Sequence, residues 1–88
     1  MNCTVFFDMS SGGSTKLSHD LIIIELPEYE AVNYFEKRFG RDPHNVTCVC
    51  CGNDYSISEY ESVDKATKAY QNYTALIIRR NEIDGENQ

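Results

Sequence analysis

The chain has 88 residues, of which 8 are lysine or arginine and 14 are aspartate or glutamate, so its formal net charge at pH 7 is -6. A chain of this length forms one small domain, whose core cannot enclose both a buried active site and a regulatory module. The excess of acid repels nucleic-acid backbones and anionic membranes. We therefore expect a non-enzymatic binding protein with no direct nucleic-acid partner and no membrane partner.

The first residues do not resemble a targeting segment. Residues 1–4 run directly into a mixed segment, whereas a secretion signal has a basic region followed by an apolar stretch. A membrane span would need about 20 consecutive apolar residues, and the sequence has no such run. We therefore expect a cytoplasmic protein whose four cysteines remain reduced.

Two apolar segments near the start predict a pair of strands. In residues 3–9, Val5 and Phe7 alternate with Thr4, Phe6 and Asp8. Residues 21–26 form a continuous apolar run that is typical of a central strand. We expect the two strands to pair as a hairpin, although the segment between them is longer than a tight turn requires.

Residues 27–39 carry a full set of helix signals. Pro27 suits the first helical position, and Gly40 supplies a left-handed stop. Acidic residues near the start and basic residues near the end favour the helix dipole. The apolar positions form a stripe that should lie on a sheet: Ala31, Val32, Phe35 and Phe39.

The second half predicts less regular structure. Residues 55–60 indicate a brief extended segment, Ser62 suits the N-cap of a second helix, and residues 74–78 read as a last strand. The order strand, strand, helix, loop, helix, strand predicts an α+β fold, with helices packed on one face of a small, mostly antiparallel sheet. Residues 1–80 form the expected domain, and residues 81–88 the expected disordered polar tail.

The segment between the first two strands is rich in hydrogen-bond donors. Consecutive glycines flanked by hydroxyls and a lysine can present a concave set of donors to a phosphate or carboxylate. The alternative is a solvated hairpin tip, since Gly and Ser also occur in any exposed loop. The candidate anion-binding residues are Ser11, Gly12, Gly13, Ser14 and Lys16.

Three of the four cysteines lie in one short segment. Cys48 and Cys51 form a C-x-x-C-G turn, which is half of a structural zinc site. Three interpretations stay open: a structural loop with buried thiols, a zinc site, and redox or nucleophilic chemistry. Any further zinc ligands would come from elsewhere, the candidates being Cys3, His44, Asp54 and the cysteines of a second copy. Zinc is the one cofactor that the sequence suggests.

Other patterns are weaker. Four acidic residues occur without a basic one between Asp54 and Asp64, which fits a solvated face or a surface that mimics nucleic-acid phosphates. His19 and His44 lie in predicted loops, and the sequence identifies no orienting residue for either, so no hydrolytic triad can be placed.

Three segments carry a family resemblance: residues 7–13, residues 35–43 and residues 46–59. They resemble a family of small, functionally uncharacterised proteins of tailed bacteriophages, over most of residues 5–63. The most specific part is the string V-T-C-x-C-C-G-x-D-Y-S-I-S-E. The resemblance assigns no activity and no site residues. It implies a phage accessory protein in the cytoplasm of an infected bacterium.

Together these observations predict a protein that counters host antiviral defence by binding. In one mechanism, the residues around Gly12 bind the phosphates of a nucleotide-derived immune signal, Tyr55 stacks on its base, and two copies complete the pocket as a homo-oligomer. In the alternative, a zinc-knuckle or acidic-surface interaction module docks on a host defence protein and inhibits it. The donor-rich segment favours the first mechanism, and the negative charge favours the second.

Overall fold

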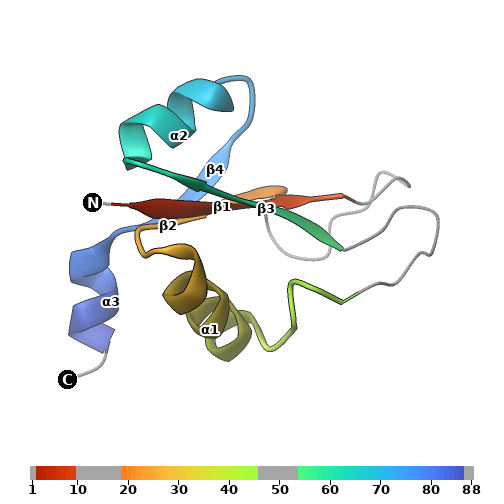
Figure 1. The fold of residues 1–88 in the computed structure, drawn as a ribbon, viewed down its shortest axis with the longest axis vertical. Helices are drawn as coiled ribbons and strands as arrows, with labels where there is room; N and C mark the ends of the chain where they lie inside the picture. Colours follow the sequence, from red (N-terminus) through yellow and green to blue (C-terminus); the bar gives the residue numbers. More distant parts are fainter. Residues whose placement is uncertain (1, 10–18, 46–53, 87–88) are drawn as a thin grey trace.

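The computed structural model describes residues 2–9, 19–45 and 54–86 (Figure 1). They form an α+β fold, as the sequence predicted. In chain order the elements are β1 (Cys3–Asp8), β2 (Leu21–Ile24), α1 (Glu28–Phe39), β3 (Tyr55–Tyr60), α2 (Val63–Ala69), β4 (Ala75–Ile78) and α3 (Arg80–Glu86).

The four strands form one sheet in the order β3-β1-β2-β4. β1 pairs antiparallel with both β2 and β3, whereas β4 lies parallel to β2. The predictions of a β1–β2 hairpin pairing and of a mostly antiparallel sheet are therefore confirmed. The segment at residues 55–60, predicted only as a brief extended piece, is a full strand at one edge.

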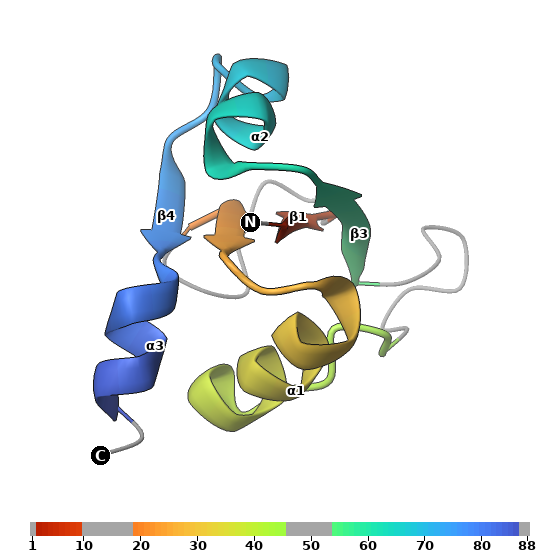
Figure 2. The same cartoon turned by 60° about the vertical axis from the view of Figure 1, so that its left-hand side comes forward.

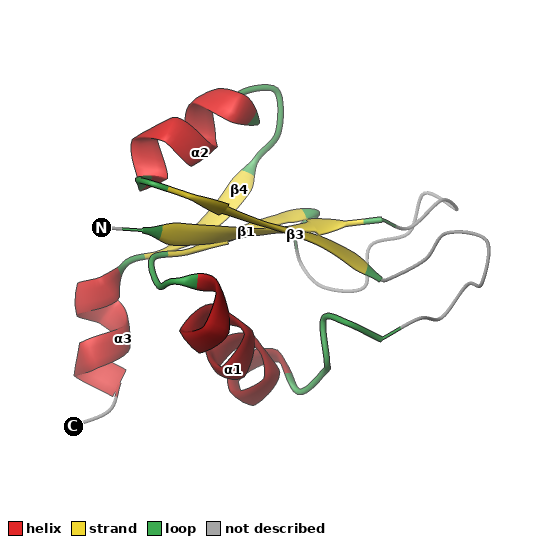
Figure 3. Cartoon of the chain, in the orientation of Figure 1, coloured by secondary structure: helices red, strands yellow, loops and turns green. Residues whose placement is uncertain are grey.

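Helices cover both faces of the sheet, and our prediction that they share one face was wrong (Figures 2 and 3). Successive side chains of a strand point to opposite faces, so a strand with consecutive apolar residues contributes to two cores. One core lies against α1 and α3 and includes Phe6, Ile22, Ile24, Phe35, Ile78 and Ile83. The other lies against α2 and includes Cys3, Val5, Leu21, Ile23, Val63 and Ala66.

The two predicted helices form where their caps indicated. Pro27 is the N-cap of α1 with an extended backbone, so the helix begins one residue later than predicted. Gly40 ends it at φ 69°, a conformation that glycine adopts without a steric penalty, and its N–H donates to the Glu36 carbonyl. The Ser62 side chain accepts from the Lys65 N–H at 3.2 Å and caps α2.

The end of the chain differs from the prediction. Residues 81–86, expected in a disordered tail, belong to α3. The Glu82 side chain accepts a hydrogen bond from the Arg79 N–H at 2.9 Å, which caps the first turn of the helix. Ile83 is 4% exposed and packs in the core beside α1. One apolar residue in a polar stretch is a weak sequence signal, and its burial depends on contacts with distant parts of the chain.

None of the helices among the described residues has the length and apolar character needed to cross a membrane.

Candidate binding surface

Most of the predicted site residues lie outside the described residues. These are the candidate anion-binding residues Ser11, Gly12, Gly13, Ser14 and Lys16, and the candidate zinc ligands Cys48 and Cys51. Their roles stay predictions. Within the described part of the chain, no group of three or more His, Cys, Asp or Glu residues is arranged to hold a metal ion.

The structure does place the points at which these two segments join the sheet. The Asp8 N–H donates to the Asp20 carbonyl at 2.8 Å, and the Met9 N–H donates to the Asp54 carbonyl at 2.9 Å. The Asp54 N–H in turn donates to the Asn45 carbonyl at 2.7 Å. The boundaries of both segments, at residues 9, 19, 45 and 54, therefore lie at one end of the sheet. We call this the attachment end.

Cys3, a candidate zinc ligand, lies far from the attachment end. It pairs with Tyr60, whereas Asp8 at the other end of β1 pairs with Tyr55. Its thiol is buried in the core beneath α2, and this burial raises the pKa of Cys3. A buried thiol with a raised pKa is what we expect of a cysteine that packs in the core. The structure thus does not favour Cys3 as a ligand.

Tyr55, the predicted base-stacking residue, is a core side chain. It is 1% exposed, and its ring meets that of Phe35 edge-on at 5.1 Å. A buried ring has no free face for a nucleotide base, so this part of the prediction was wrong. The alternation of residues 55–60 already indicated a strand, and the pairing with β1 turns Tyr55 toward α1.

Among the described residues, three aspartates and one arginine influence the pKa of Tyr55 at the attachment end. Burial, followed by the charge of Asp8, raises the pKa of Tyr55 to about 12. Asp54 and Asp20 add to this effect, and Arg41 opposes it. Asp8 and Asp54 are themselves 5% exposed, so solvent screens their charges less than those of surface carboxylates.

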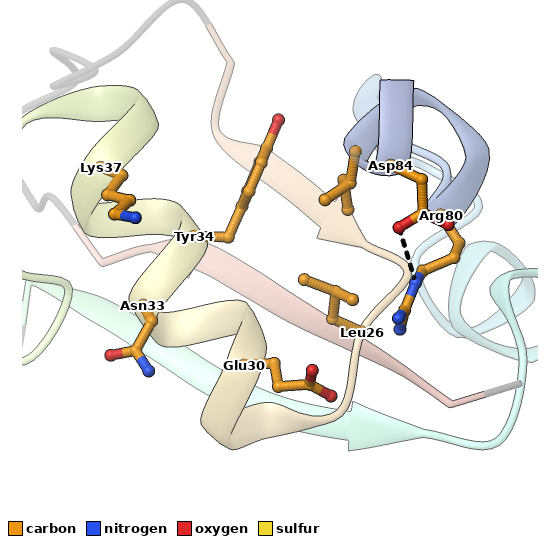
Figure 4. A pocket seen from close by; sticks show the side chains of 8 residues that line it. Leu26, Glu30, Asn33, Tyr34, Lys37, Arg80 and Asp84 are labelled. Carbon is orange, nitrogen blue, oxygen red and sulfur yellow. Dashed lines mark hydrogen bonds and ion pairs between the residues drawn. The ribbon is translucent and has the colours of Figure 1, made fainter. Parts of the chain in front are cut away.

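A pocket of about 320 Å³ lies between α1 and α3, and Figure 4 shows its lining side chains. Its charged residues have both signs: Glu30 and Asp84 against Lys37 and Arg80. The Arg80 Nε atom lies 3.3 Å from the Asp84 carboxylate, so the guanidinium already has an acidic partner. The mixture of charges does not select a ligand of either sign.

A larger groove of about 550 Å³ lies on the other side of α1, toward β3. We call it the α1–β3 groove. Its lining residues come from three parts of the chain: Glu28, Tyr29, Val32, Asn33, His44 and Glu59. Val32 is half-buried, whereas Tyr29 is 81% exposed. The groove therefore combines an apolar surface, an exposed aromatic ring and two carboxylates.

Glu59 holds the two walls of this groove together. One carboxylate oxygen accepts from the Glu28 N–H at 2.9 Å, and the other accepts from the Asn2 side-chain amide at 2.6 Å. The first bond satisfies a free N–H at the start of α1, where negative charge is also favoured by the helix dipole. Glu28 and Glu59 are 31 positions apart, and no local sequence signal indicates that they meet.

An aromatic cluster lies on the opposite face of the sheet. Phe7, Tyr60, Tyr70 and Tyr73 contact one another, with ring centroids 4.9 to 6.3 Å apart. Tyr73 is 50% exposed, and the others are half-buried. Phe7, Tyr60 and Tyr70 pack against the core beneath α2, and the cluster leaves part of its surface accessible.

Comparisons of the chain with protein-family models, curated proteins and solved structures found no match. The resemblance to phage proteins therefore stays a prediction from the sequence.

Proposed function

We propose that the protein is a non-catalytic interaction module that docks on another protein through an acidic surface. The observation that supports this most directly is the gathering of three aspartates at the attachment end. Backbone hydrogen bonds bring Asp8, Asp20 and Asp54 together there, where the two most distinctive segments of the sequence join the sheet, and Asp20 is exposed. Clustered acidic residues attract a basic protein surface and speed its association.

The sequence resemblance supports a biological setting for this activity. A phage accessory protein acts in the cytoplasm of the infected bacterium, and its partner would be a host defence protein that it inhibits. If zinc binds at Cys48 and Cys51, it would stiffen the segment that joins the sheet at Asn45 and Asp54. Zinc would then have a structural role, with the docking chemistry carried by protein side chains.

Sequestration of a nucleotide-derived immune signal ranks below this function. Its predicted stacking residue, Tyr55, is buried, and the nearby aspartates oppose a phosphate. Its remaining support is the donor-rich composition of residues 11–16.

The proposal is tested with two exposed carboxylates at opposite ends of the molecule. Asp20→Asn removes a charge from the attachment end, and Asp64→Asn removes one from the first turn of α2. The partner would first be identified by affinity isolation from host cells and then purified for calorimetry. We expect Asp20→Asn to weaken binding about two- to fivefold, as for an exposed ion pair, and Asp64→Asn to leave it unchanged. Added salt should weaken wild-type binding.

Native mass spectrometry separates this function from sequestration. Protein purified without chelator would reveal subunit number, bound zinc and any retained small ligand in one spectrum. A retained nucleotide, together with no measurable affinity for any purified host protein, would replace the proposed function by sequestration.

A further inference from the structure

The two edges of the sheet differ in the backbone groups that they leave facing outward. In an antiparallel pair, residues alternately direct their N–H and C=O groups toward and away from the partner strand. The Met9 N–H bond to the Asp54 carbonyl fixes the phase of the β1–β3 ladder. The backbone groups that point toward β1 are therefore those of Ser56, Ser58 and Tyr60. Those of Ile57 and Glu59 point away from the sheet.

The β4 edge is shortened by the helix that follows it. The Glu25 N–H donates to the Ile78 carbonyl, which shows that Ile78 directs its backbone groups toward β2. The backbone N–H and C=O groups of Ala75, Ile77 and Arg79 therefore point away from β2. The Arg79 N–H is already bound by the Glu82 side chain, and the Arg79 carbonyl accepts from the first turn of α3. The edge thus ends after Ile77.

The β3 edge, in contrast, borders the α1–β3 groove. Ile57 and Glu59 have their side chains on the α1 side of the sheet, where Ile57 packs against the core and Glu59 bonds to the start of α1. In a strand added beside β3, every second side chain would point to this same side. Those side chains would enter the groove beside Val32 and the exposed ring of Tyr29.

The charges of the groove select the kind of side chain that fits. Glu28 and Glu59 supply two carboxylates, and a cation between them would also lie near the aromatic ring of Tyr29. A lysine or arginine has a long apolar stem for the Val32 surface and a charged end for the carboxylates. An acidic side chain would be repelled.

We propose that the β3 edge and the α1–β3 groove bind an extended segment of a partner protein, which adds to β3 as a fifth strand and places a lysine or arginine between Glu28 and Glu59. This inference rests on the proposed protein-docking function and adds a second contact site, at the end of β3 away from the attachment end, together with the chemistry of the segment that binds there. Backbone hydrogen bonds from Ile57 and Glu59 would supply affinity, and the groove would supply selectivity for a basic side chain.

Amide hydrogen exchange tests the edge directly. In the free protein, the amides of Ile57 and Glu59 should exchange faster than those of Ser58 and Tyr60, which bond to β1. The probe is a capped heptapeptide of alternating valine and lysine, added to millimolar concentration. We expect it to slow exchange at Ile57 and Glu59 selectively. Unchanged exchange at both amides would overturn the proposal.

Charge-removing variants test the groove. Glu28→Gln and Glu59→Gln keep a side-chain oxygen, so the N–H of residue 28 can still donate to the side chain of residue 59. Each should raise the Kd of the peptide about two- to fivefold. Glu30→Gln is the matched control, because Glu30 is an exposed acid in the same helical turn that lines the other pocket. An equal loss of affinity in the control would overturn the assignment of the groove.

A second peptide, with glutamate in place of lysine, should not protect the two amides, and equal protection by both peptides would contradict the charge selectivity. This experiment is independent of the natural partner. If that partner binds normally but the valine–lysine peptide does not, the proposed function stands and this inference fails.

Discussion

Replacing Phe35 with alanine should remove the central contact between α1 and the sheet. The Phe35 side chain is fully buried, and its ring stacks on Phe6 with a centroid separation of 4.6 Å. It also contacts the rings of Phe39 at 4.9 Å and Tyr55 at 5.1 Å. Truncation of a buried phenylalanine costs about 3 to 5 kcal/mol through lost burial and the cavity left behind. These three ring contacts favour the upper half of that range.

This loss is large relative to the stability of the molecule. A domain of 88 residues has an expected free energy of unfolding of about 4 to 13 kcal/mol. Urea denaturation, followed by circular dichroism, should therefore give a midpoint lowered by about 2 M or more, or a chain unfolded without urea. Phe35→Leu retains much of the volume and should lose less. Tyr29→Ala, at the exposed side of the same helix, should leave the midpoint nearly unchanged. A wild-type midpoint for Phe35→Ala would refute the packing described here.

Two further predictions concern Tyr55 and the cysteines. Because the folded protein raises the pKa of Tyr55 from 10 to about 12, the folded state holds this proton more tightly than the unfolded chain does. Below pH 10 the shift has no effect, and between about pH 10 and 12 it should lower the free energy of unfolding by roughly 2 to 3 kcal/mol. Tyr55→Phe should reduce this pH dependence in urea titrations, and an identical dependence in both proteins would contradict the burial of the hydroxyl. If the purified protein contains stoichiometric zinc, the Cys48→Ser, Cys51→Ser double variant should lose it in native mass spectrometry, whereas full zinc content in that variant would exclude these two ligands.

Local signals predicted the parts of the fold that depend on local structure. Gly40 and Ser62 each act within one turn of a helix, and both caps are where the sequence placed them. The register of β3 depends instead on pairs such as Val5 with Ser58, which are more than fifty positions apart. The two-sided core had a visible signal in the adjacent Phe6 and Phe7, but the choice of face for each helix depends on tertiary packing.

Less of the candidate site than of the fold could be predicted from the sequence. Tyr55 has the properties of both a ligand-stacking residue and a core residue, and only its position opposite Asp8 and beside Phe35 distinguishes them. The groove requires Glu28 and Glu59 to meet, which follows from how α1 crosses the sheet. By contrast, the acidic character of the surface follows from composition alone, since charges remain on the outside of a small domain.

The turn of the chain at Arg79 also limits how copies of this protein can assemble. A sheet with two open edges can accept neighbours on both sides and grow into a fibre. Here α3 leaves β4 only a short free edge, so a long added strand can pair only with β3. Two copies that met through β3 would each occupy the other's open edge, with their β4 strands outermost. Such contact would stop at a symmetric dimer, because a twofold interface closes on itself.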